Sequence, residues 1–174
     1  MLLRLLLLAV LALPGTAGAQ LHAGGQLARI DHVADGDTVD LRSGAKVRLV
    51  QIDTPEVYFS PECYGAQASR ITKRLLPPGT LVRLTSEPRT DSVDRYGRLL
   101  RYVVRVRDGL DINVQLVRVG AAAPYFYDGR RGRYAGMLDR LARRARAAHR
   151  GLWGACPATP YQPDRGVATG PLRP

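Results

Sequence analysis

The chain has 174 residues, a length that suits one ordinary domain, and its 26 Lys and Arg against 15 Asp and Glu give a formal net charge of +11. Hydrophobic residues make up 45% of the chain, which is normal for a packed globular protein and excludes wholesale disorder and fibrous repeats. The positive charge indicates an anionic partner, either nucleic acid or an acidic membrane surface, although charge alone often serves only solubility.

Residues 1–19 have the pattern of a secretory signal peptide. Arg4 precedes an unbroken apolar run at residues 5–13, and Ala17-Gly18-Ala19 has the small-x-small pattern of a signal peptidase site. The run is far shorter than the roughly 20 residues that a membrane-spanning helix needs. We therefore predict export, to the periplasm or the medium, and no stable membrane insertion.

The next part of the chain predicts strands and then a helix. Three strands rich in Val, Ile and Leu are expected at residues 27–33, 38–42 and 46–52, because Asp-Gly and Ser-Gly pairs supply turns between them. A helix is expected at residues 64–76, where apolar side chains recur on one face and Pro77-Pro78-Gly79 ends the pattern.

The rest of the domain predicts two strands and two helices. The strands are expected at residues 80–85 and 99–106, and a short helix at 112–119. Residues 131–150 are expected to form the longest helix, with one apolar stripe and an arginine-rich face that we interpret as solvated. Five strands and three helices predict an α+β domain, a small β-barrel with helices packed on it.

The end of the chain is rich in proline, and two cysteines flank the central part. Residues 157–174 contain five prolines, a composition that predicts a disordered tail. Cys63 and Cys156 have no CxxC or Cys/His spacing, which argues against a zinc site. In an oxidising compartment such a pair is expected to form a disulfide.

Polar residues gather at three predicted strand ends. They occur in Asp35-Gly36-Asp37-Thr38, in Arg48 with Asp53, Thr54 and Glu56, and in Asp94-Arg95-Tyr96-Gly97-Arg98. A calcium loop of the EF-hand type starting at Asp31 is excluded, because Arg42 stands where a bidentate Glu is required. At one edge of a barrel, carboxylates suit a hard cation such as Ca²⁺, paired arginines suit a phosphate, and a further carboxylate can activate water. This is the set that phosphodiester hydrolysis requires.

The sequence resembles the staphylococcal nuclease family over residues 27–154. The resemblance rests, in chain order, on Asp35-Gly36-Asp37-Thr38-Val39, Arg48-Leu49, Asp53-Thr54-Pro55-Glu56, Tyr64-Gly65 with the following helix, Tyr96-Gly97-Arg98, Asn113 to Gly120, and Gly151-Leu152-Trp153. It implies a five-stranded OB-type barrel with three packed helices, in agreement with the elements predicted above. It also implies a Ca²⁺-dependent nuclease that hydrolyses DNA and RNA with little sequence specificity.

The family's residue roles carry over by position. The resemblance implies Ca²⁺ ligands at Asp37 and Asp53 and at the backbone carbonyl of Thr54. It implies a general base at Glu56 and, at Arg48 and Arg98, groups that stabilise the transition state of the phosphate. Substrate contacts are implied at Arg95, Tyr96 and Tyr125, although Phe126 and Tyr127 compete with Tyr125 for its place. No obligate protein partner is expected.

Two other functions are consistent with parts of the sequence. A non-catalytic OB-type module could bind single strands through basic and stacking contacts, but such modules usually lose the acidic ligands or the arginines, which are intact here. A basic protein bound to acidic envelope polymers would explain the charge but not the gathered polar residues.

Overall fold

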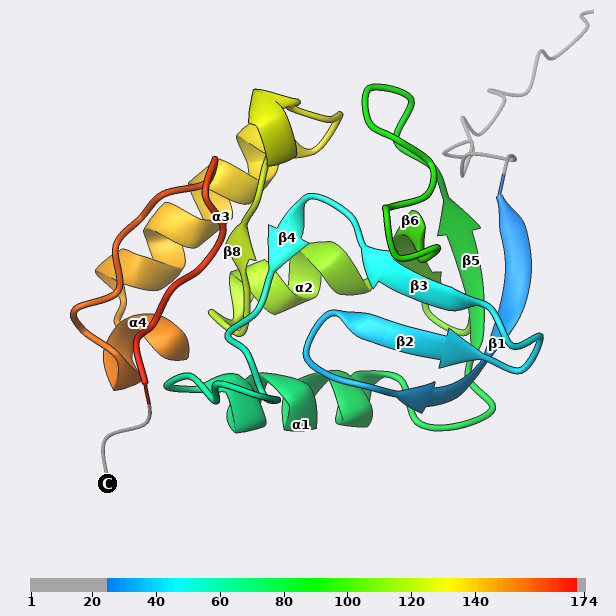
Figure 1. Ribbon diagram of the computed structural model, residues 1–174, viewed down its shortest axis with the longest axis horizontal. Helices are drawn as coiled ribbons and strands as arrows, with labels where there is room; N and C mark the ends of the chain where they lie inside the picture. Colours follow the sequence, from blue (N-terminus) through cyan, green and yellow to red (C-terminus); the bar gives the residue numbers. More distant parts are fainter. Residues whose placement is uncertain (1–24, 172–174) are drawn as a thin grey trace, which may run out of the picture.

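Five strands pair edge to edge and close into a barrel in the computed structural model, which describes residues 25–171 (Figure 1). They are β1 (Gln26–Val33), β2 (Thr38–Leu41), β3 (Lys46–Leu49), β5 (Leu81–Thr85) and β6 (Leu99–Arg105). Neighbours in the order β3-β2-β1-β5-β6 are antiparallel, and the parallel pairing of β3 with β6 closes the barrel. The predicted α+β barrel of five strands is therefore confirmed. The expected signal peptide, residues 1–19, lies outside the described residues.

The third predicted strand, residues 46–52, is wrong as one continuous element. It breaks at Gln51, whose φ is 66°, and continues as β4 (Ile52–Asp53), which leaves the barrel and pairs with β8 (Ala123–Pro124). A buried hydrogen bond stabilises the break: the Asn113 side chain donates to the Val50 carbonyl at 2.9 Å. The break turns Asp53 out of the barrel wall.

Three main helices pack on the barrel as predicted. They are α1 (Gly65–Leu75), α2 (Ile112–Arg118) and α3 (Ala135–Ala147), with the short α4 (Leu152–Ala155) after them. The sequence did not predict the short elements α4, β8, β7 (Leu110–Asp111) and a 3-10 turn, Tyr127–Gly129. The last long helix starts four residues later than expected, because the backbone N–H groups of Gly132 and Arg133 donate to the side chains of Gln51 and Glu87.

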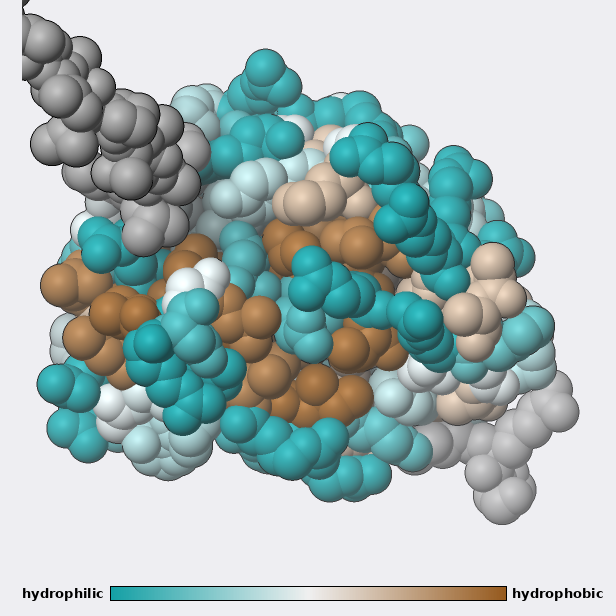
Figure 2. Space-filling view, turned by 180° about the vertical axis from the view of Figure 1, so that it is seen from behind, coloured by the Kyte–Doolittle hydropathy of each residue, from teal (hydrophilic) through white to brown (hydrophobic). Residues whose placement is uncertain are grey.

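The core fills the barrel and continues beneath the helices. Apolar side chains with 0% exposure come from all five barrel strands and from α2 and α3. They include Ile30, Val39, Leu49, Val82, Val103, Leu116 and Leu138. Seen from behind, apolar residues also show in the middle of the surface, between hydrophilic residues that border them (Figure 2). No helix within residues 25–171 is long and apolar enough to cross a membrane.

The C-terminal segment, residues 157–171, differs from the expected disordered tail. It contains no helix, yet it lies along α3 and returns beside β8 (Figure 1). The Tyr161 hydroxyl donates to Asp139 at 2.6 Å, and the Phe126 N–H donates to the Pro163 carbonyl at 2.6 Å. The predicted disulfide between Cys63 and Cys156 is present and joins the residue just before this segment to the loop that leads into α1. Composition pointed to disorder, whereas this covalent anchor and a few apolar side chains hold the segment against the domain.

Candidate active site

Arg48 stands at the centre of the predicted site. Its Nη1 lies 3.0 Å from Asp37 Oδ2, and its Nη2 lies 2.5 Å from Asp53 Oδ1. Nη1 also donates to the carbonyls of Leu49 and Ile52 at the break between β3 and β4. The Arg48 side chain is only 13% exposed, and these partners hold its guanidinium from several sides. One arginine thus brings the two predicted metal ligands together.

Asp37 is the more buried of the two carboxylates. Its Oδ2 accepts hydrogen bonds from the Thr54 N–H at 2.8 Å and from the Thr54 hydroxyl at 2.9 Å. Burial raises the pKa of Asp37 to about 7, and the negative charges of Asp35 and Asp53 act in the same direction, while Arg48 and Thr54 oppose them. Asp35, Asp37 and Asp53 thus repel one another around a single guanidinium, and a bound cation would favour the charged form of Asp37.

The turn before β2 sets the position of Asp37. Asp35 Oδ1 accepts hydrogen bonds from the N–H groups of Asp37 and Thr38 at 3.0 and 2.6 Å. A Cβ atom at Gly36 would lie 2.4 Å from the Thr54 hydroxyl oxygen, so only glycine fits between the two segments. Asp35 was not predicted to have a role, although an Asp two residues before a predicted ligand in an Asp-Gly turn is a usable signal.

Arg98 joins the same site from the residue just before β6, the strand that pairs with β3. Its Nε donates to Asp94 Oδ2 at 2.7 Å, and its Nη1 donates to the Thr38 hydroxyl at 3.3 Å. The Thr38 hydroxyl in turn lies 3.3 Å from Asp37, so one side chain links Arg98 to the acidic pair. Burial alone would raise the pKa of Asp94, but hydrogen bonds from Arg98 and Tyr96 outweigh burial and lower this pKa. Asp94 therefore orients Arg98, a role that was not predicted from the sequence.

Glu56, the predicted general base, lies on the exposed loop after β4. Its Oε1 accepts the N–H groups of Val57 and Tyr58, both at 2.9 Å, so the carboxylate folds back on its own loop. No hydrogen bond joins it to Arg48 or Arg98 among the described residues. The structure brings the arginines and aspartates together but leaves Glu56 at the margin of the site.

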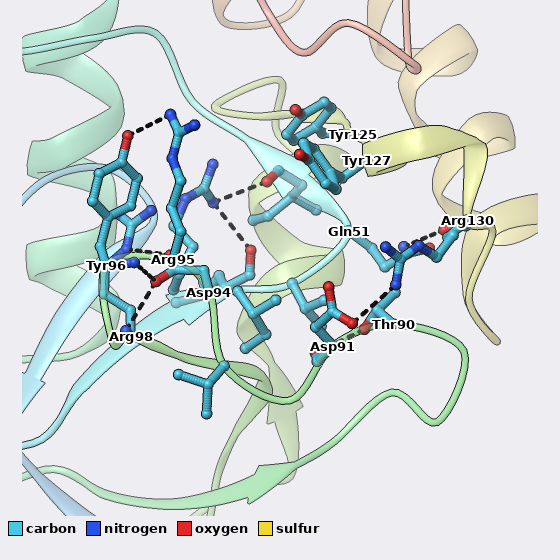
Figure 3. Close-up of a pocket in the computed structure, with 16 residues that line it drawn as sticks. Gln51, Thr90, Asp91, Asp94, Arg95, Tyr96, Arg98, Tyr125, Tyr127 and Arg130 are labelled. Atoms are coloured by element: carbon cyan, nitrogen blue, oxygen red, sulfur yellow. Dashed lines mark hydrogen bonds and ion pairs between the residues drawn. The ribbon is translucent and has the colours of Figure 1, made fainter.

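A hollow of about 360 Å³ opens beside the arginines (Figure 3). Arg95 and Tyr96 lie on one side of it, with the Arg95 guanidinium 4.8 Å from the centre of the Tyr96 ring. Tyr125 and Tyr127 lie on the other side, with their rings edge to face at 6.2 Å. The predicted substrate contacts therefore share one cavity with Arg48 and Arg98.

The structure narrows the choice of the later aromatic residue. Phe126 is fully buried in the core, whereas Tyr125 and Tyr127 line the hollow. Burial and the nearby Asp53 charge raise the pKa of Tyr125, so this phenol stays protonated and can donate a hydrogen bond. Arg130 and Asp91, joined by an ion pair at 3.0 Å, close the far end of the hollow and were not predicted as site residues.

The donors fit a hard cation. Asp37 and Asp53 offer carboxylate oxygens around one guanidinium, and Thr54 follows directly with a backbone carbonyl, the oxygen ligands that Ca²⁺ prefers. Within residues 25–171 no group of three or more His, Cys, Asp or Glu is arranged to hold a metal ion. Water would therefore have to supply the remaining ligands.

Comparison with known proteins agrees with this geometry. The family model described as "Staphylococcal nuclease homologue" matches residues 46–155, more than half of the chain. "Endonuclease YhcR" of Bacillus subtilis is 36% identical over 109 residues, which is 56% of this chain but only 9% of that relative. An "Uncharacterized endonuclease" of Escherichia coli O157:H7 is 36% identical over 137 residues, 76% of this chain and 81% of the relative. "Protein ParB" of Escherichia coli is 32% identical over 156 residues, 84% of this chain and 80% of the relative.

Proposed function

Because the chain belongs to the staphylococcal nuclease family and is a nuclease, we propose that it hydrolyses both DNA and RNA in a Ca²⁺-dependent reaction after export from the cytoplasm. The observation that carries the proposal is the pairing of Arg48 with Asp37 and Asp53, with Arg98 linked to the same group through Thr38. Two arginines and two carboxylates, each with a side chain at most 25% exposed, are suited to a phosphate dianion and a divalent cation together.

The arginines act on the charge that develops on the phosphate. Arg98 is oriented by Asp94 through Nε, while its Nη2 has no hydrogen-bond partner within the described residues and is available to a phosphate oxygen. The carbonyls of Leu49 and Ile52 hold Arg48 in place, so its guanidinium is already positioned when the substrate arrives. Donors in fixed positions stabilise the pentacoordinate transition state more than the ground state, which lowers the barrier.

The other residues bind metal, water and base. Asp37, Asp53 and the Thr54 carbonyl would hold Ca²⁺, which when bound supplies a Lewis acid for a phosphate oxygen. Glu56 would take a proton from the attacking water, after its carboxylate turns from its own loop toward the site. Tyr96 and Tyr125 would stack on bases or contact phosphates, and such contacts accept any base, which favours low sequence specificity.

A digestion assay tests the substrate and metal proposals. The full-length protein is incubated with single- and double-stranded DNA and with RNA, in Ca²⁺ and then in excess chelator. We expect all the substrates to be cut in Ca²⁺ and none in chelator, with Arg98→Ala protein, purified in parallel, as the control for contaminating nucleases. Full hydrolysis in chelator, or stoichiometric zinc in the purified protein, would contradict the Ca²⁺ proposal.

Export is tested separately. Residues 1–19 have the signal-peptide pattern, and the Cys63–Cys156 disulfide is the kind of bond that persists outside the cytosol. We expect the mature protein to begin at Gln20 when its N-terminus is sequenced. An intact leader on protein recovered from the cytoplasm would contradict the proposal.

A further inference from the structure

The second oxygen of the Asp53 carboxylate is bound by the C-terminal segment. While Arg48 holds Oδ1 at 2.5 Å, the backbone N–H of Val167 donates to Oδ2 at 2.8 Å. The two donors approach one carboxylate from residues far apart in the chain. A carboxylate held at both oxygens cannot rotate freely, and each oxygen keeps a further lone pair for a cation.

Packing and hydrogen bonds hold the C-terminal segment in this position. The Val167 side chain is 9% exposed and packs in a small apolar cluster with Ala123 of β8, Ala145 of α3 and Trp153 of α4. Farther along, the Cys63 N–H donates to the Gly170 carbonyl at 2.9 Å and the Thr169 hydroxyl donates to the Cys63 carbonyl at 2.7 Å. The segment is thus fastened on both sides of the residue that reaches Asp53.

Gly166 makes the close approach possible. Its φ is 81°, and a Cβ atom there would lie 2.7 Å from Asp53 Oδ2 and 3.7 Å from Tyr125. A side chain at this position would push the segment away from the carboxylate or displace the carboxylate itself. The family model ends at residue 155, so this contact comes from a part of the chain that the family match does not cover.

We propose that the Val167 N–H is a positioning group of the active site, which orients the Asp53 carboxylate for the cation. The proposal rests on the proposed role of Asp53 as a Ca²⁺ ligand. Groups that hydrogen-bond to metal ligands typically change metal affinity by about 10–100-fold when they are lost. The C-terminal segment is therefore a working part of the site and not a trailing end.

Two glycines of this segment provide a matched test. Gly166 and Gly170 have nearly equal φ values, 81° and 78°, but a Cβ at Gly170 meets nothing within 4 Å. Gly166→Ala and Gly170→Ala should therefore carry the same backbone strain, and only the first intrudes on Asp53. Ca²⁺ binding to each full-length protein is measured by isothermal titration calorimetry without substrate, with thermal unfolding as the check on folding.

We expect Gly166→Ala to weaken Ca²⁺ binding at least about 10-fold, while Gly170→Ala binds like the unmodified protein. Equal affinity in the two variants would overturn the positioning role while leaving the metal proposal intact. Absence of Ca²⁺ binding by the unmodified protein would overturn the metal proposal itself, and this one with it.

A second pair keeps the test decisive if Gly166→Ala does not fold. Val167→Pro removes the N–H, whereas Val167→Ala keeps it and removes only apolar contact. Weaker Ca²⁺ binding in Val167→Pro than in Val167→Ala supports the role. Equal affinity in these two variants overturns it.

Discussion

The centre of the site and its rim are built in opposite ways. The centre joins Asp37, Arg48, Asp53 and Arg98, which come from separate strands and loops, and its side chains are 7–25% exposed. The rim uses close neighbours in sequence, the pair Arg95-Tyr96 on one side and Tyr125 with Tyr127 on the other, and Tyr96 is 67% exposed.

This difference separates two tasks. Charges held in a buried centre act with little screening, so they are suited to stabilising a transition state. Exposed aromatic and basic side chains can adapt to different bases, so they are suited to holding substrate. Long-range contacts should therefore control turnover, and local ones should control affinity.

The largest expected effect comes from cutting a long-range connection. Replacing both Cys63 and Cys156 by Ser removes a bond that joins residues 93 positions apart in the chain. On the chain-entropy model the free energy of unfolding should fall by about 4–5 kcal/mol. Urea denaturation measures this loss, with Tyr96→Ala as a rim control whose stability should stay unchanged. Equal stability of the double variant and the unmodified protein would show that the centre does not depend on this link.

Glu56 tests whether a group at the margin can serve the centre. Glu56→Gln keeps an oxygen for the N–H groups of Val57 and Tyr58 but cannot accept a proton from water. If Glu56 is the general base, kcat should fall on the order of 10²–10⁴-fold with Ca²⁺ affinity retained. Steady-state kinetics and calorimetry on the same preparation measure both. An unchanged kcat would assign activation of water to another group.

Arg98 tests the centre directly. Arg98→Ala should lower kcat by on the order of 10²–10³ and leave KM nearly unchanged, because it removes donors that act on developing charge. Arg98→Lys should recover only part of the activity, since a point charge cannot replace a two-pronged contact. Arg107→Ala, on an exposed turn remote from the hollow, is the control. A change in KM alone would place Arg98 with the rim.

The smallest effect is expected at the rim. Tyr96→Ala should raise KM by about 10-fold with little change in kcat, because stacking stabilises bound substrate and transition state alike. Kinetics on one DNA substrate, run beside Arg98→Ala, give the comparison. Should Tyr96→Ala reduce kcat as strongly as Arg98→Ala does, the division between centre and rim is wrong.

Local patterns in the sequence were sufficient for most of the fold. The strand and helix positions follow from apolar periodicity and from turn residues such as Gly44, so the five-stranded barrel could be predicted. The break at Gln51 could not, because a residue with positive φ there is held by distant partners. The Gln51 side chain accepts from the Gly132 N–H at 2.6 Å and donates to the Arg130 carbonyl at 2.8 Å, contacts that no local pattern reveals.

Residue types and their spacing likewise predicted most of the candidate site. Asp37, Asp53, Arg48 and Arg98 are recognisable because carboxylates and arginines at strand ends have few structural reasons to gather. Only the tertiary structure decided that Phe126 is core while Tyr125 faces the hollow, that Glu56 folds onto its own loop, and that Val167 reaches Asp53. The physical reason is the same in each case. A local pattern reports which face of an element is apolar, but which distant group meets a given polar atom depends on how the elements pack.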